Sequence, residues 1–163
     1  MSHFSVGVII PASLNTVEAM STKVTELLAP YDERKEVALY TEPCFMCKGM
    51  GTLKESKLCS YCEGEGQYET TYNPLSKWDW WTVGGRWTLL IPSCWCVVNE
   101  LTEAQRHTLF ALVTPQGAWY AHGETVRDAR VTDEMATRIW CDEADAVLAK
   151  YADHKLVCVD CHI

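Results

Sequence analysis

Two copies of one cysteine pattern constrain the fold of this chain more than any other feature. Each copy is a Cys-x-x-Cys pair followed by Gly-x-Gly, and the four cysteines are Cys44, Cys47, Cys59 and Cys62. Two such pairs, joined by eleven residues, have the spacing of a four-thiolate zinc site, because the loop lets both pairs converge on one ion. The glycines permit the positive-φ turns that wrap the backbone around a metal. The sequence therefore predicts one structural Zn2+; a docking surface for a protein or nucleic acid is the alternative interpretation.

The rest of the chain alternates between strand-like and helix-like patterns. Buried strands are predicted at residues 4–10 and 155–159, a hairpin over 110–122, and amphipathic helices over 16–28 and 132–151. Shorter strands are predicted at 36–41, 68–72, 88–91 and 94–98, and a short helix or loop at 101–107. This order predicts an α+β fold, with two helices packed on a mixed or antiparallel sheet and an inserted four-cysteine zinc module.

The predicted domain boundaries follow from composition. Residues 43–67 contain few large aliphatic side chains, as expected where a metal replaces a hydrophobic core. We therefore expect residues 1–42 and 68–163 to form the α+β domain, with 43–67 as the zinc-binding insertion.

Charge and cysteine usage narrow the classes of partner. The formal net charge of -8 argues against general nucleic-acid binding, which needs clustered Lys and Arg. The nine cysteines are odd in number and four have metal-ligand spacing, and no signal-peptide pattern opens the chain. A reduced cytoplasmic protein is therefore predicted. No apolar run approaches the roughly 20 residues of a membrane span, so no membrane partner is expected.

A tryptophan-rich segment follows the cysteine pairs. Four of the seven tryptophans lie within residues 78–87, interleaved with acidic, glycine and arginine residues. A Gly-Gly backbone beside a guanidinium suits phosphate or carboxylate, and aromatic faces suit stacking of a base. The predicted pocket consists of Trp78, Asp79, Trp80, Arg86 and Trp87. Tryptophans that simply fill the core, with an internal Asp79–Arg86 ion pair, are the alternative.

The last four residues are Asp160, Cys161, His162 and Ile163, and the first three carry polar or reactive side chains. Alternation along a strand puts Asp160 and His162 on one face and Cys161 on the other, which argues against a Cys–His dyad of neighbours. Asp160 and His162 are therefore candidates to close the Trp/Arg pocket, with plain solvation as the alternative. Cys94, Cys96 and His162 are candidates for a second metal site, although buried free cysteines explain the first two as well.

Two resemblances add to these patterns. Each Cys-x-x-Cys-x-Gly-x-Gly resembles the repeat of the DnaJ cysteine-rich domain, whose four repeats hold two zincs; two repeats imply one zinc and a link to unfolded-protein binding. The stretches NPLSKWDWWTVGGRW, TPQGAWYAHGE and VDCHI, with LLAPYDE at Leu27–Glu33, resemble motifs of a poorly characterised group of small bacteriophage and bacterial proteins. That second resemblance implies a phage or prophage origin, and hence the host cytoplasm.

The leading hypothesis is a phage-encoded accessory protein that counteracts host defence by binding a nucleotide-like small molecule in the Trp/Arg pocket. A zinc-stabilised inhibitor that masks a host defence protein by protein–protein contact is a second version. The alternative is a metal-assisted hydrolase of a nucleotide or phosphoester that uses Asp79, Glu124, Asp160 and His162. The chain lacks a His-Glu-x-x-His motif, a phosphate loop and a nucleophile elbow, so no catalytic residue is assigned.

Overall fold

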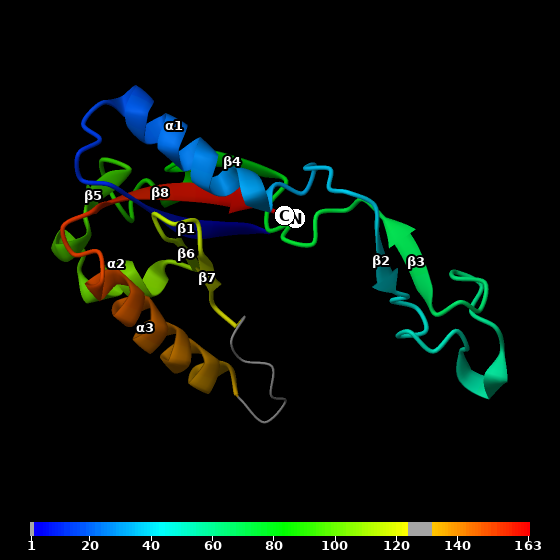
Figure 1. Ribbon diagram of the computed structural model, residues 1–163. Helices are drawn as coiled ribbons and strands as arrows, with labels where there is room; N and C mark the ends of the chain where they lie inside the picture. Colours follow the sequence, from blue (N-terminus) through cyan, green and yellow to red (C-terminus); the bar gives the residue numbers. More distant parts are fainter. Residues whose placement is uncertain (1, 124–131) are drawn as a thin grey trace. The chain divides into compact units, whose positions relative to one another are not determined.

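The computed structural model describes residues 2–123 and 132–163 (Figure 1). The chain divides into two compact units, one made of residues 1–32 with 76–163 and the other of residues 33–75. We call the first the α+β unit and the second the cysteine module. The module extends beyond the predicted insertion of residues 43–67 on both sides.

The α+β unit is built on a six-stranded mixed sheet (Figure 1). Its strands are β1 (His3–Ile10), β4 (Trp80–Val83), β5 (Trp95–Val97), β6 (Ala111–Val113), β7 (Trp119–Ala121) and β8 (Lys155–His162). Its helices are α1 (Val17–Leu28), α2 (Glu103–Thr108) and α3 (Asp133–Ala149). The strand order is β4-β8-β1-β6-β7, and β5 pairs with β8 on the edge that β4 also uses. Only β1 and β6 run parallel among these described strands, so the predicted α+β class with a mixed sheet is confirmed.

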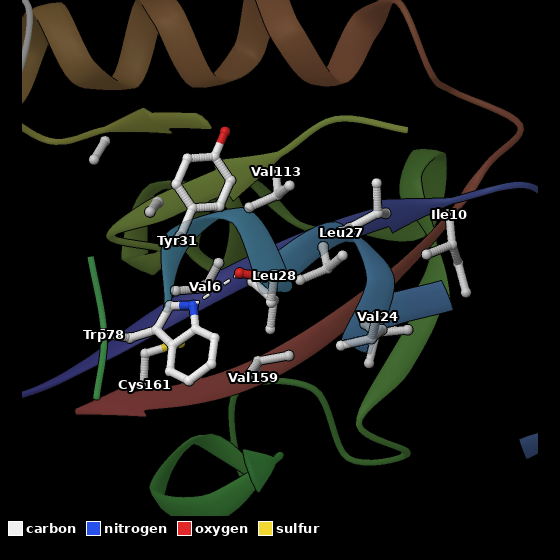
Figure 2. Packing of buried hydrophobic residues seen from close by; sticks show 14 of the residues in the cluster. Val6, Ile10, Val24, Leu27, Leu28, Tyr31, Trp78, Val113, Val159 and Cys161 are labelled. Atoms are coloured by element: carbon white, nitrogen blue, oxygen red, sulfur yellow. Dashed lines mark hydrogen bonds between the residues drawn. The ribbon is translucent and has the colours of Figure 1, made fainter. Parts of the chain in front are cut away.

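The two faces of this sheet carry two cores, because successive side chains of β1 and β8 point to opposite sides. Val6, Val8 and Ile10 pack with Val157 and Val159 beneath α1 (Figure 2). On the other face, Ile9, Leu112, Leu156 and Cys158 pack against Trp140, Ala144, Val147 and Leu148 of α3. The ribbon shows α1 and α3 on opposite sides of the sheet, so β1 and β8 are covered on both faces (Figure 1).

Helix ends follow capping rules. Thr16 caps α1, because its Oγ1 accepts a hydrogen bond from the N–H of Ala19. Thr132 caps α3 in the same way through the N–H of Met135.

The predicted strand at residues 88–91 is wrong. Gly84 and Gly85 have φ angles of 71° and 50°, and these turn the chain away from β8 after Val83. Pairing with β8 stops at the hydrogen bond from the Gly84 N–H to the Cys158 carbonyl. It resumes where the Cys158 N–H donates to the Cys94 carbonyl. Residues 85–93 therefore form a loop between β4 and β5 that begins with the 3₁₀ helix Gly85–Trp87, and the two flanking strands pair with β8.

The cysteine module contains a two-stranded antiparallel sheet. Its strands are β2 (Tyr40–Pro43) and β3 (Gln67–Thr70), with Tyr40 opposite Thr70. The strand predicted at residues 36–41 is therefore displaced, and residues 36–39 are not in a strand. Leu39 is exposed, so the apolar pattern that suggested a strand there does not reflect burial.

Candidate functional site

The four predicted metal ligands lie together in the cysteine module. All four are buried, and their sulfur atoms lie within 4.8 Å of one another. The distance between sulfurs is 3.8 Å for Cys44 and Cys59 and 3.7 Å for Cys47 and Cys62. A tetrahedron with metal–sulfur bonds of about 2.3 Å has sulfurs about 3.8 Å apart. The cluster therefore has the size and donor set to bind one metal ion through four thiolates.

The backbone around this cluster repeats itself in its two halves. Gly51 N–H donates to the sulfur of Cys47 at 3.1 Å, and Gly66 N–H donates to that of Cys62 at 3.2 Å. These bonds fix the orientation of the ligands and spread the negative charge of a thiolate. A Cβ on Gly51 would lie 2.2 Å from the Gly64 carbonyl oxygen, and one on Gly66 would lie 2.5 Å from the Gly49 oxygen. The glycines are thus required by the close approach of the two halves as well as by their positive φ.

The surroundings shift the pKa of two of the thiols in opposite directions. The backbone N–H of Cys62 lowers the pKa of Cys59 to about 7, whereas burial raises the pKa of Cys44 to about 11. Burial thus opposes ionisation of Cys44, and a divalent cation among the four sulfurs would offset that cost.

The residues of the predicted Trp/Arg pocket separate in the structure. Trp78 is 7 % exposed and belongs to the core under α1, where its indole N–H donates to the Leu28 carbonyl (Figure 2). Trp80 is 48 % exposed, Arg86 is exposed, and Trp87 is half-buried against the core under α3. For Trp78 the core interpretation therefore holds, and this side chain is not available to a ligand.

The two predicted carboxylates, Asp79 and Asp160, each contact a histidine at one end of the sheet. Asp160 is 2 % exposed, and its Oδ1 accepts a hydrogen bond from His3 Nδ1 at 3.0 Å. Asp79 Oδ1 pairs with His162 Nδ1 at 2.7 Å, so Asp79 takes His162 and not Arg86 as its partner in the described contacts. The rings of His3 and His162 are 5.0 Å apart. We call these four residues the paired-histidine site.

The register of the sheet explains why these four residues lie together. His3 is the Cα partner of His162 across β1 and β8, and Trp80 is the partner of His162 across β4 and β8. Ser5 and Asp160 are likewise opposite each other, two residues further along. These side chains share the sheet face that carries the α3 core, while Cys161 is buried in the other core, as alternation predicts.

Asp160 is held as an anion although it is buried. Burial would raise the pKa of this carboxyl, but the backbone N–H of Arg86, 3.0 Å from Oδ2, and the His3 ring hold the pKa below its usual range. The Trp87 indole nitrogen is buried and has no hydrogen-bond partner among the described residues. It lowers the same pKa, so we treat it as a dipole close to the carboxylate rather than as a bonded donor. An anionic Asp160 accepts from Nδ1 and leaves Nε2 as the remaining nitrogen of His3.

A groove of about 580 Å³ opens beside His3 in the α+β unit. Its lining includes Phe110, Trp119, Lys77 and His122, and also Ser2 and Ile163. Such a volume is typical of small-molecule sites, which are mostly apolar with a few polar groups. His3 is the member of the paired-histidine site that lines this groove, and Trp119 and Phe4 of the lining also pack against the core under α1.

The other predicted arrangements do not form in the described part of the chain. Within residues 2–123 and 132–163, only the four cysteines of the module place three or more metal-ligand atoms within 4.8 Å, so Cys94, Cys96 and His162 are not a second metal site. In the hydrolase hypothesis, Asp79 and Asp160 are hydrogen-bonded to imidazoles instead of meeting at one ion. Glu124 lies outside the described residues.

Sequence reasoning missed His3. Residue 3 precedes the apolar run 4–10 and carries no motif, and its partner Asp160 is 157 positions away. Only the register of β1 against β8 brings it into the site, and hydrophobic pattern alone does not specify that register.

Searches with this chain against models of protein families, curated proteins and solved structures found no match. Every helix in the described part of the chain is too short or too polar to cross a membrane.

Proposed function

We propose that the α+β unit binds an anionic small molecule of the nucleotide type at the paired-histidine site. The observation that carries this proposal is the pair of imidazoles 5.0 Å apart, each with its Nδ1 committed to a separate carboxylate. Because Nδ1 donates to a carboxylate, Nε2 is the atom that meets a ligand. In the protonated ring, Nε2–H donates to a phosphate oxygen.

The surroundings favour a ligand that carries an aromatic ring as well as a charge. Trp80 is largely exposed, and its ring lies 6.2 Å from that of His3. The groove beside His3 adds Phe110 and Trp119 as apolar surface and Lys77 as a basic group. A base stacks on such surfaces, and a phosphate meets the imidazoles. Arg86 is exposed, and its backbone N–H donates to Asp160. In this proposal its guanidinium is therefore a further contact for the phosphate.

We also propose that the metal of the cysteine module is zinc and that its role is structural. An all-thiolate, tetrahedrally spaced and buried donor set supports this choice, since closed sites of this type hold zinc without an open coordination position. The resemblance to bacteriophage proteins supports a phage accessory role against host defence; that role rests on the motifs alone.

The test is titration of the full chain with AMP, adenosine and inorganic phosphate by calorimetry, with NMR of the histidine ring protons. We expect AMP to bind, phosphate to bind more weakly, and His162→Asn to lower AMP affinity at least tenfold. Trp80→Ala should weaken AMP roughly tenfold and leave phosphate unchanged, because stacking contributes about 1–3 kcal/mol per base. His154→Asn, a histidine away from the site, is the matched control.

Failure of both AMP and phosphate to bind at millimolar concentration would refute the proposal. Equal AMP affinity of the His162→Asn variant and the unchanged protein would refute it as well, because the ligand would then bind elsewhere.

A further inference from the structure

We propose that His3 and His162 also act as a general acid–base pair that hydrolyses a phosphodiester bond in the bound ligand; this rests on the proposed binding function. A single cationic side chain is sufficient to bind phosphate. Hydrolysis needs more, because a base must activate the nucleophile while an acid protonates the leaving oxygen. The structure supplies two imidazoles at directly opposite positions of β1 and β8, each held in a fixed tautomer by its own carboxylate.

The proposed pair divides two roles between the rings. His3 faces Asp160, His162, the Trp80 ring and the groove that contains Lys77, and His162 faces Asp79 and His3. The ring centroids are 5.0 Å apart, and in this proposal a neutral ring acts as the base while a protonated ring acts as the acid.

The side chains nearby favour water as the nucleophile. Cys158 and Cys161 are fully buried in the two cores, and burial raises the pKa of both thiols. Ser5, opposite Asp160, is buried; its hydroxyl donates to the Thr108 carbonyl and accepts from the N–H of Phe110. Each of these potential covalent nucleophiles is thus packed away or hydrogen-bonded, whereas the histidine side chains keep 15–21 % of their surface exposed.

The step balances with water as the only co-reactant. The oxygen of water attacks phosphorus, and the neutral imidazole takes the proton that water loses. The phosphorus–oxygen bond to the leaving alcohol breaks, and the protonated imidazole gives its proton to that oxygen. The products are a phosphomonoester and an alcohol, and proton exchange with solvent restores the starting state of the two rings. Asp79 and Asp160 act as positioning residues, because they contact the imidazoles and not the reacting atoms.

The experiment follows hydrolysis of two phosphodiesters by the full chain, the linear dinucleotide pApA and bis(4-nitrophenyl) phosphate. We expect turnover without added divalent cations and a bell-shaped dependence of kcat/KM on pH. His3→Asn and His162→Asn should each lower kcat on pApA about 10²–10⁴-fold. The double variant should lose little more, because the two groups act as a unit. The variant that lacks the acid should retain more activity on the nitrophenyl ester, whose leaving group needs no proton, and His154→Asn should match the unchanged protein.

Each variant should also lose one limb of the pH profile, which a loss of folding alone would not produce. The unchanged protein provides a check that needs no variant, since a flat profile would overturn the acid–base assignment. Turnover that requires Mg2+ or Mn2+ would overturn it in favour of metal-assisted hydrolysis. AMP binding without hydrolysis of either ester would overturn this inference alone, whereas failure of both AMP and phosphate to bind would refute the proposed function beneath it.

Discussion

Gly85 offers the sharpest test of how the paired-histidine site is held together. Its φ is 50°, and a Cβ at this position would lie 2.4 Å from Cβ and 2.5 Å from Oδ2 of Asp160. Gly85→Ala therefore combines a left-handed backbone with a collision against the base of a buried side chain. The backbone term costs about 1–2 kcal/mol. Displacing Asp160 from His3 and from the Arg86 N–H costs about 1.5–3 kcal/mol more, as for hydrogen bonds to a charged group.

We expect Gly85→Ala to lower the free energy of unfolding by about 2.5–5 kcal/mol, the sum of these two costs. Gly117→Ala is the matched control, because Gly117 also has a positive φ, 85°, but an added Cβ there meets nothing within 4 Å. Its loss should be about 1–2 kcal/mol.

Urea unfolding followed by tryptophan fluorescence is the assay, and all seven tryptophans lie in the α+β unit, so the signal reports that unit alone. Equal losses in Gly85→Ala and Gly117→Ala would refute the reasoning, because the cost would then come from the backbone and not from Asp160. Preserved AMP affinity in Gly85→Ala would contradict the role given to the Asp160–His3 pair.

Three further predictions concern other parts of the chain. Cys47→Ser and Cys62→Ser should release the metal to the same extent, because both sulfurs accept an equivalent backbone N–H bond; metal analysis checks this. The unfolding transition reported by tryptophan fluorescence in urea should stay unchanged, because the tryptophans lie in the other unit. Because the pKa of Asp160 is lowered on folding, its contribution to stability is present above the unfolded pKa of about 3.9 and is lost as pH falls through the folded value. Asp160→Asn should therefore flatten stability against pH in acid, and a curve parallel to that of the unchanged protein would be a contradiction. Trp78→Phe should cost about 1–3 kcal/mol through the unpaired Leu28 carbonyl, without changing AMP binding in calorimetry.

The sequence predicted the metal cluster well because its determinants are local. Cys44 and Cys59 are fifteen residues apart, and ligand spacing together with the following glycines suffices to bring them together. The long helices, the hairpin at residues 110–122 and the buried strands follow from periodicity in the same way. The predicted α+β class therefore needed only patterns within single segments.

The paired-histidine site was only half predictable, because it depends on register. Alternation placed Asp160 and His162 on one face correctly, but the predicted strand ended at residue 159, whereas β8 continues to His162. Asp79 and Trp80 were identified from their neighbours in sequence, yet their contacts with His162 and His3 depend on how β4 and β1 align with β8. The strand predicted at residues 88–91 failed because Gly84 and Gly85 divert the chain, a tertiary effect that apolar pattern does not reveal.

The pairing of β1 with β8 also determines at which stage of folding the paired-histidine site forms. His3 is synthesised 157 residues before Asp160. Contacts of such long range form late, because the entropy of closing the chain must be overcome first. The cysteine module, whose ligands span nineteen residues from Cys44 to Cys62, can close on a metal while the C-terminal strand is still being made. Under the proposed function, a newly made chain would thus have a cysteine cluster able to bind a metal before its paired-histidine site forms, and any block to docking of β8 would leave a protein without the proposed ligand site.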